Sequence, residues 1–359
     1  MVLKISKMYN IKEVLVIAIE RHMLANYRNF LDELKEHKPV RVVVLPSITS
    51  MSLLNKIRDG NKMFCEIRKS LVKQIGSNYI KDTLIVYSNS EGFVLSNKDS
   101  WMPQLINCKE VMLQHGLMPS KVPHKFTRNF VNFVFKKFRG YYLFGNGFGG
   151  IKANYIIVWG KYYYNYLVND RGWESDKVLV SGRLLKLMPT APQIGKDSQS
   201  RKCLFLLQDL QQYYDVTLQK QNEYFLEITN VLSEHYDEVI VKKHPKMNNS
   251  VYELFVTNGK VTISNTTLEE EIMNCSRVYS FFSSALLDAY LMHKEIVAIY
   301  LLELPIDLYR MFKRVVWINE LEEYEKEYLD DKFASIDNDF FSIENNCDTI
   351  INKLFNNDN

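Results

Sequence analysis

The stretch Arg277-Val-Tyr-Ser-Phe-Phe-Ser-Ser-Ala-Leu-Leu-Asp288 decides the fold class. Its residues 278–281 have the length and apolar character of a buried strand, and residues 284–291 have the pattern of a short helix. Two serines join the strand to the helix. A strand, a short loop and a helix in this order form half of a βαβ unit, so the stretch predicts a parallel sheet with crossover helices.

The same alternation extends from this stretch toward both ends of the chain. Thr267 followed by Glu270 is a capping-box signature, which marks one helix start. The pattern predicts an α/β fold of two Rossmann-like βαβ domains. Predicted strands lie at 13–19, 40–45, 83–87, 110–114, 155–159, 178–181, 202–207, 238–242, 261–263 and 296–299. Further predicted helices lie at 23–36, 50–59, 66–75, 219–234, 267–274 and 304–312.

A polar stretch at 189–200, with Pro189 and Pro192, predicts an interdomain linker. We therefore predict an N-terminal domain at 1–188 and a second domain at 201–335. Residues 336–359 form a helix and a tail, and the helix, at about 341–354, is expected to pack back over the first domain. Open parallel sheets bind ligands at the carboxyl ends of their strands, so the two domains would face each other across a binding cleft.

Composition favours a folded cytoplasmic protein. The chain has 359 residues, of which 47% are apolar and 13% aromatic, enough for two domains with substantial cores. Five single cysteines without CxxC pairs predict reduced, buried thiols. Neither a signal-peptide pattern nor an apolar run of about 18 residues is visible. The net charge of +3 gives no nucleic-acid footprint, so nucleic acid is not an expected partner.

A basic aromatic segment at 121–142 lies inside a long acid-free region. No Asp or Glu occurs from Val111 to Asn169, whereas eight Lys or Arg residues do. On a helix, phenylalanines at 126, 130, 133 and 138 would form an apolar stripe flanked by cations. This pattern predicts peripheral binding to an anionic membrane surface. The alternative is an amphipathic helix packed on the protein core with its cations solvated.

The run Val239-Ile-Val-Lys-Lys-His244-Pro245 delivers a histidine to the carboxyl end of a predicted strand. Pro245 ends the strand and fixes the turn. His244 can donate a hydrogen bond to a phosphate oxygen, and Lys242 and Lys243 raise the local positive potential. The alternative is an ordinary surface loop.

Ser283 and Ser284 stand at the start of the helix predicted at 284–291. Their hydroxyls, together with the backbone N–H groups of the helix start, can cradle a phosphate. Plain N-capping by serine is the alternative. Because the His244 and Ser283 loops follow one another in successive βα units, we predict that together they hold a nucleotide.

A third loop, Gln114-His115-Gly116, ends a predicted strand of the first domain. A histidine there suits a general base that removes a proton from an acceptor hydroxyl, since its pKa lies near neutrality. The alternatives are a structural role for His115 and a carboxylate base. Glu20, Asp209 and Asp215 follow predicted strands and are the carboxylate candidates.

No metal constellation or cofactor motif is visible. The remaining histidines are dispersed, and the predicted nucleotide loops contain no Asp-x-Asp. We therefore expect no metal and no cofactor. His244, the helix dipole and the serines would stabilise the departing phosphate instead.

These motifs carry a family resemblance. An HP motif at His244-Pro245 followed by an SS motif at Ser283-Ser284 resembles the bacterial sialyltransferases and polysialyltransferases, which have the glycosyltransferase B (GT-B) architecture. The same loops are similar to those of capsule transferases and of CDP-glycerol and CDP-ribitol transferases. A wider frame, from Gln114-His-Gly through Tyr155–Gly160 to Ser181-Gly182-Arg183, is similar to capsule-synthesis proteins.

The resemblance implies an inverting, metal-independent transferase. A nonulosonic, sialic-type sugar would pass from a CMP-activated donor to a saccharide or lipid-linked saccharide, in bacterial capsule or lipopolysaccharide synthesis. The first domain would bind the acceptor, and the enzyme would lie on the inner face of the cell membrane. By this resemblance the donor-binding residues are His244, Pro245, Ser283, Ser284, Lys243 and Gly182.

Two further functions stay open at this point. One is transfer of a polyol phosphate from CDP-glycerol or CDP-ribitol, or of a sugar from another nucleotide donor, by the same GT-B fold. The other is a degenerate transferase fold that serves as a scaffold in a polymer-synthesis complex.

Overall fold

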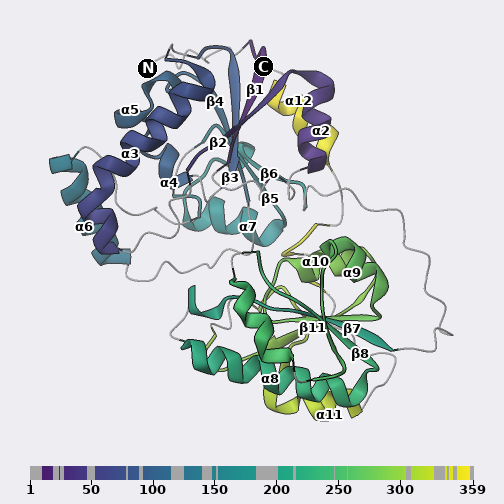
Figure 1. Ribbon diagram of the computed structural model, residues 1–359. Helices are drawn as coiled ribbons and strands as arrows, with labels where there is room; N and C mark the ends of the chain where they lie inside the picture. Colours follow the sequence, from purple (N-terminus) through teal and green to yellow (C-terminus); the bar gives the residue numbers. More distant parts are fainter. Residues whose placement is uncertain are drawn as a thin grey trace. The chain divides into compact units, whose positions relative to one another are not determined.

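The computed structural model divides into two compact units, residues 1–186 with 338–359, and residues 187–337. It describes residues 10–355 except 19–23, 25–27, 47–52, 78–79, 89–91, 115–124, 140–147, 151–152, 183–200, 213–215, 246, 257, 305–308, 327–335, 338 and 343–345. The predicted linker, 189–200, lies outside the described residues, so its boundaries stay a prediction. The two units are shown in Figure 1.

The described part of the first unit contains a sheet of parallel strands in the order β2-β1-β3-β4-β5-β6. β1, β3 and β4 consist almost entirely of buried residues, as expected of parallel strands covered on both faces. Its strands are β1 (Glu13–Ala18), β2 (Val40–Val44), β3 (Thr83–Ser88), β4 (Lys109–Leu113), β5 (Tyr155–Val158) and β6 (Val178–Val180). Its helices are α2 (Arg28–His37), α3 (Leu53–Ile75), α4 (Gly92–Leu95), α5 (Lys98–Trp101), α6 (Lys125–Arg139), α7 (Lys161–Asn165) and α12 (Cys347–Phe355).

Elements from early and late parts of the chain pack together in the core of this first unit. Alternate residues of its strands, such as Val14 and Val16 or Leu84 and Val86, point to one face and form a single cluster with α2 and α12. Figure 1 shows α12, in yellow, beside α2, in purple. The C-terminal helix therefore packs on the first unit, as expected, although it begins at Cys347 rather than near residue 341.

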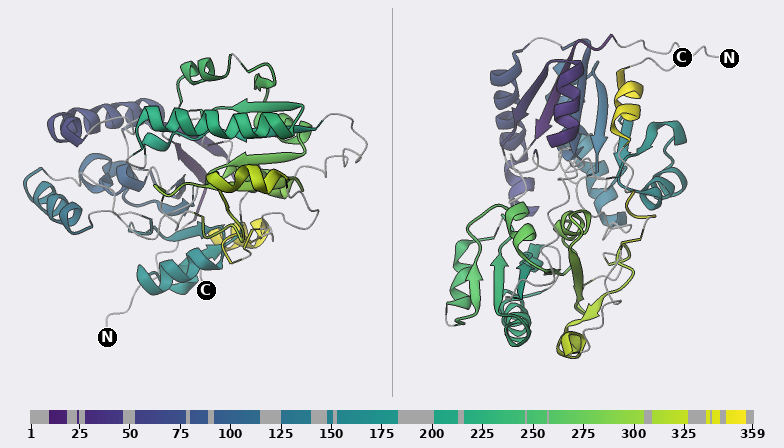
Figure 2. Two further views of the ribbon diagram at one scale, coloured as in Figure 1. Left: turned by 90° about the horizontal axis from the view of Figure 1, so that it is seen from below. Right: turned by 90° about the vertical axis from the view of Figure 1, so that its right-hand side faces the viewer.

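The second unit has the strand order β12-β11-β10-β7-β8-β9 over its described residues, again all parallel. Helices α8 and α11 pack against each other on one face, and α9 and α10 cover the other (Figures 1 and 2). Its strands are β7 (Lys202–Leu206), β8 (Glu238–Lys242), β9 (Val261–Ile263), β10 (Arg277–Ser280), β11 (Glu295–Tyr300) and β12 (Val316–Trp317). Its helices are α8 (Leu218–His235), α9 (Leu268–Asn274), α10 (Ala285–Leu291) and α11 (Leu321–Lys326).

The α/β prediction is confirmed, and most strands lie within one or two residues of their predicted bounds. The predicted capping box is present, since the Thr267 hydroxyl oxygen accepts from the Glu270 N–H and the Glu270 carboxylate accepts from the Thr267 N–H. This pair satisfies two backbone donors at the start of α9.

Three local predictions are wrong. The helices predicted at 50–59 and 66–75 form one helix, α3, because Gly60 costs only about 1 kcal/mol inside a helix and does not end it. The described residues of the helix predicted at 304–312 are a turn, held where the Tyr309 hydroxyl donates to the Ile299 carbonyl. The thiol of Cys65 is exposed, whereas the other four cysteines are buried as predicted.

Candidate functional site

The strand order of the second unit brings the two predicted phosphate loops to one edge of the sheet. β7 lies between β10 and β8, and the three strands are parallel, so their carboxyl ends meet there. The chain reverses its direction of winding between β7 and β10, and ligands bind at such switch points in open α/β sheets. Neighbouring strands lie about 4.8 Å apart, so the loops after β8 and β10 begin roughly 10 Å apart.

This arrangement corrects the prediction that the two loops lie in successive units. β9 and α9 separate them along the chain, and β7 brings them together by lying between their strands. The residues that follow β7 therefore lie between the two loops, and they belong to the candidate site.

The loop after β8 is a braced turn. The Met247 N–H donates to the His244 carbonyl over 2.9 Å, and the Lys243 ammonium donates to the Met247 carbonyl over 3.0 Å. The Tyr252 hydroxyl oxygen accepts from the Lys243 N–H over 3.1 Å. His244 is half-buried and Pro245 is exposed at the tip of the turn. The loop thus holds its histidine at the strand end, while the Lys243 side chain supports the loop.

Lys242, the last residue of β8, points to the neighbouring strand. Its ammonium donates to the Ser264 hydroxyl over 3.0 Å and to the Thr266 carbonyl over 2.6 Å. Burial lowers the pKa of Lys242, and the nearby Glu271 carboxylate opposes that shift. The charge of Lys242 therefore lies beside the loop, but its hydrogen bonds hold the residues that follow β9.

The loop after β10 is fixed to β7 by a glutamine. The Gln208 side-chain oxygen accepts from the Phe282 N–H over 2.9 Å and from the Ser280 hydroxyl over 3.3 Å. The Ser280 hydroxyl also lies 2.9 Å from the Leu206 carbonyl. These contacts hold the backbone just before Ser283 and Ser284 against the carboxyl end of β7.

Ser283 and Ser284 lie at the start of α10. The Ser283 hydroxyl oxygen accepts from the Ala285 N–H over 3.2 Å, and Ser284 is the residue before the helix. A hydroxyl that accepts in this way retains its own hydrogen as a donor. Both serines are partly exposed, so the loop can offer hydroxyl donors to a ligand at the switch point.

Asp209 follows Gln208 at the same strand end. Within the part of the chain that the structure describes, its Oδ1 atom is buried and has no hydrogen-bond partner. A buried polar atom left without a partner costs about 1–3 kcal/mol, so each such atom calls for an explanation. Asp209 lies at the end of β7, between the two predicted loops, and it stays a candidate base. The sequence had not indicated Gln208, whose role depends on a strand about seventy residues away.

The predicted catalytic residues of the first unit lie outside the described residues. These are His115 and Glu20, and the further candidate Asp215 of the second unit is also outside them. Gln114, which precedes His115, is buried, and its side-chain oxygen accepts from the Trp159 N–H over 3.0 Å. Gln114 thus holds the end of β5 to the end of β4, as Gln208 holds the residues after β10 to the end of β7.

Two glycines of the wider motif frame, Gly160 and Gly182, are required by the local backbone. At Gly160 a Cβ atom would lie 2.3 Å from the backbone of Phe340, so only glycine allows the segment that contains Phe340 to pass this close to the end of β5. Gly182 has φ +66°, a left-handed conformation that favours glycine, two residues after the end of β6. Gly182 belongs to the first unit, whereas the other predicted donor-binding residues belong to the second.

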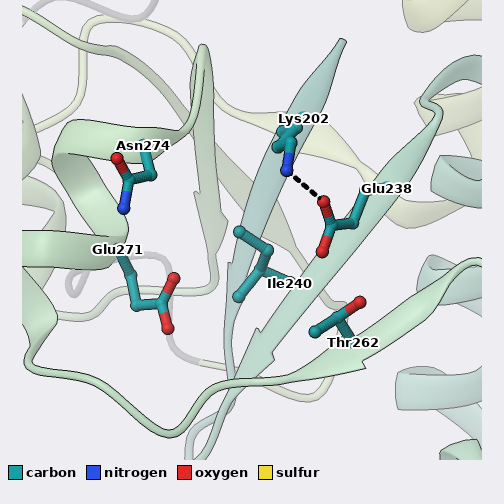
Figure 3. A pocket seen from close by; sticks show the side chains of 6 residues that line it. All are labelled: Lys202, Glu238, Ile240, Thr262, Glu271 and Asn274. Carbon is teal, nitrogen blue, oxygen red and sulfur yellow. Dashed lines mark ion pairs between the residues drawn. The ribbon is translucent and has the colours of Figure 1, made fainter. Parts of the chain in front are cut away.

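A pocket of about 320 Å³ opens elsewhere on the second unit, between the sheet and α9 (Figure 3). Lys202 and Glu238, which begin β7 and β8, form an ion pair of 2.5 Å at its wall, and this bond lowers the pKa of Glu238. The pocket lies toward the amino ends of the strands. It therefore does not contain the predicted phosphate loops. Among the described residues, no group of three or more His, Cys, Asp or Glu side chains is arranged to hold a metal ion.

Comparison with protein families gives a match that covers the switch point. Residues 177–302 match the alpha-2,8-polysialyltransferase (POLYST) family. The match covers about a third of the chain, from the start of β6 to the end of β11, and includes both predicted phosphate loops, Gln208 and Asp209. The predicted resemblance to sialyltransferase-like proteins is confirmed by this match. No curated protein sequence matches the chain.

Solved structures share the fold. The glycotransferase of kitacinnamycin is 8% identical, with 88% of this chain and 90% of that chain covered and a TM-score of 0.56. The N-terminal domain of Candida albicans trehalose-6-phosphate phosphatase is 9% identical, with 97% and 93% covered and a TM-score of 0.51. A UDP-N-acetylglucosamine 2-epimerase is 11% identical, with 89% and 88% covered and a TM-score of 0.50. The GT-B fold class is confirmed, and with the polysialyltransferase match it supports a glycosyltransferase.

Proposed function

We propose that the protein transfers a nonulosonic, sialic-type sugar from a CMP-activated donor to a saccharide acceptor in bacterial capsule or lipopolysaccharide synthesis. The observation that carries the proposal is the polysialyltransferase match over residues 177–302. It coincides with the strands whose carboxyl ends form the switch point, and there the structure brings a histidine loop and a serine loop to either side of β7. Chemistry suited to a phosphate thus occurs where the fold binds ligands.

The donor phosphate would lie between the two loops. The His244 imidazole would donate to one phosphate oxygen, and the hydroxyls of Ser283 and Ser284 would donate to others. As the bond between the sugar and the phosphate oxygen breaks, negative charge grows on CMP, and these donors stabilise it most at that moment. Because the donors are positioned by the loops before the reaction, no metal ion is required in this proposal.

The acceptor hydroxyl would attack the anomeric carbon from the side opposite CMP. One C–O bond forms as the other breaks, so the configuration at that carbon inverts. The hydroxyl proton passes to a base, and His115 is the first candidate for it. Asp209 is the second, supported by its buried Oδ1 atom at the switch point. A lipid-linked acceptor would bring the enzyme to the inner face of the cell membrane.

A thermal-shift screen with CMP, CDP, UDP, GDP and ADP tests the nucleotide. Selective stabilisation by CMP is expected, since a ligand that binds only the folded state raises its stability. Transfer from CMP-N-acetylneuraminic acid is then measured with oligosaccharide acceptors. Release of CMP together with transfer of glycerol phosphate from CDP-glycerol would replace this proposal with polyol-phosphate transfer. Absence of any nucleotide shift would favour the scaffold function.

The variant His244→Ala tests the donor site. We expect activity to fall about 100-fold or more, because one preorganised donor to the leaving group is lost, while the melting temperature stays near that of the parent. His37→Ala is the matched control, since His37 is an exposed histidine of the first unit. Near-normal turnover of His244→Ala would refute the assigned site.

A further inference from the structure

Helix α6 presents its phenylalanines to solvent. The side chains of Phe130, Phe133 and Phe138 are 62%, 65% and 75% exposed. Large apolar side chains scattered singly over a surface are ordinary, but three on one helix of 15 residues are a concentration that indicates an interaction surface. The alternative in which this helix packs its phenylalanines on the core is therefore wrong for these three residues.

The amphipathic character of α6 is reversed relative to a core-packing helix. With 3.6 residues per turn, Phe130 lies almost opposite Asn132, which is only 4% exposed, and Phe133 and Phe138 lie to either side of Phe130. Lys136 lies on the Asn132 side, and its ammonium donates to the Ser100 hydroxyl of the neighbouring segment over 3.4 Å. A surface helix normally turns its apolar face inward. α6 instead turns three phenylalanines outward and buries Asn132.

The charge of α6 indicates what kind of partner covers its outward face. Helix α6 contains five Lys or Arg residues and no Asp or Glu, and the acid-free region around it extends from Val111 to Asn169. Lys137 is exposed, and its ammonium lies 5.8 Å from the centre of the Phe138 ring, so cation and aromatic rings share one surface. Such a surface is complementary to apolar chains beneath a layer of anionic groups.

We propose that the outward face of α6 docks the protein on an anionic lipid membrane, with Phe130, Phe133 and Phe138 inserted among the acyl chains and Lys137 among the headgroups. A helix of 15 residues is about 22 Å long, shorter than the roughly 30 Å hydrocarbon core, so it would lie along the surface. Over the described residues, no helix combines the length and apolar character that crossing a bilayer requires. The inference stands independently of the transferase reaction.

A second copy of the chain is a poorer occupant. A twofold contact through this face would bring the Lys137 ammonium of one helix near that of the other, with no acidic residue on either helix to pair them. Like charges facing each other across an interface cost free energy. An anionic bilayer removes this repulsion and also covers the rings.

Vesicle co-sedimentation of the full-length protein tests the proposal, with pure phosphatidylcholine compared to mixtures containing phosphatidylglycerol. We expect binding to the anionic vesicles and at least a tenfold loss in the triple variant Phe130→Ser/Phe133→Ser/Phe138→Ser. Lys137→Gln should weaken binding about fivefold, the contribution of one basic residue near an anionic surface. The matched control is Val256→Ser/Leu302→Ser, which removes two exposed apolar side chains of the second unit.

Three outcomes would overturn the proposal. They are no binding to anionic vesicles, equal binding by the phenylalanine variant, and equal binding to neutral and anionic vesicles. Concentration-dependent dimerisation without vesicles, abolished by the phenylalanine substitutions, would assign the face to a second copy. Because the assay contains neither nucleotide nor acceptor, its failure leaves the proposed reaction intact.

Discussion

Gln208 and Gln114 make the same kind of contact in the two sheets. Each follows a strand, and each accepts a backbone N–H from the end of the neighbouring strand, Phe282 in one unit and Trp159 in the other. Substitution of either by alanine leaves that N–H without its partner, which costs about 1–3 kcal/mol where the group is buried. The two variants should therefore lose similar stability.

Their effects on nucleotide binding should differ. We expect Gln208→Ala to weaken CMP binding about tenfold, because the backbone before Ser283 is no longer held to β7. Gln114→Ala should leave CMP affinity unchanged, since it acts in the first unit. Isothermal titration of both variants, with melting temperatures measured in parallel, separates positioning from a general loss of stability. Equal losses of CMP affinity would refute the positioning role of Gln208.

At the scale of elements, a buried ion pair fixes α11 to β10. Arg277 and Glu325 are each about 2% exposed at the side chain, and their nearest atoms lie 3.0 Å apart. The Tyr279 hydroxyl donates to the same carboxylate over 2.6 Å. Arg277 also pairs with Glu295 over 3.0 Å, so loss of the Glu325 charge leaves the guanidinium with one carboxylate, and the cost should lie toward the lower end of the about 3–5 kcal/mol typical of a broken buried pair.

The prediction for α11 has a control on the same helix. Glu325→Gln should lower stability strongly in denaturant titrations, whereas Glu322→Gln should change it little, because the Glu322–Lys326 pair is exposed. Hydrogen exchange should show faster exchange in α11 and at the start of β10 in the first variant alone. Similar unfolding midpoints for the two variants would contradict the assigned importance of the buried pair.

Strands and helix starts could be predicted from the sequence where the pattern of the segment itself determines them. Strands such as β3 and β8 are apolar runs bounded by polar residues, and the capping residues Thr267 and Glu270 act through neighbours three positions away. The helix predicted at 304–312 is wrong because the aromatic side chain of Tyr309 belongs to a turn, where its hydroxyl donates to the Ile299 carbonyl of β11. Local periodicity does not contain that contact.

The candidate site was predictable only in part at the scale of the whole molecule. His244 and Ser283 stand out because each follows a strand with phosphate-binding chemistry. Strand order, however, places β7 between them, and this order arises from pairing between segments about seventy residues apart. For that reason Gln208 could not be recognised from sequence, and Asp209 could be proposed as a base but not located at the switch point.

Both units have a switch point, between β1 and β3 in the first and between β7 and β10 in the second, so topology alone does not decide which one binds the nucleotide. The side chains favour the second, because the histidine loop, the serine loop and the unpartnered Asp209 oxygen meet there. Hydrogen–deuterium exchange with saturating CMP should therefore slow exchange after β7, β8 and β10. His244→Ala at the same CMP concentration is the control and should lose most of this protection. Protection concentrated in the loops after β1 and β3 would instead move the donor site to the first unit.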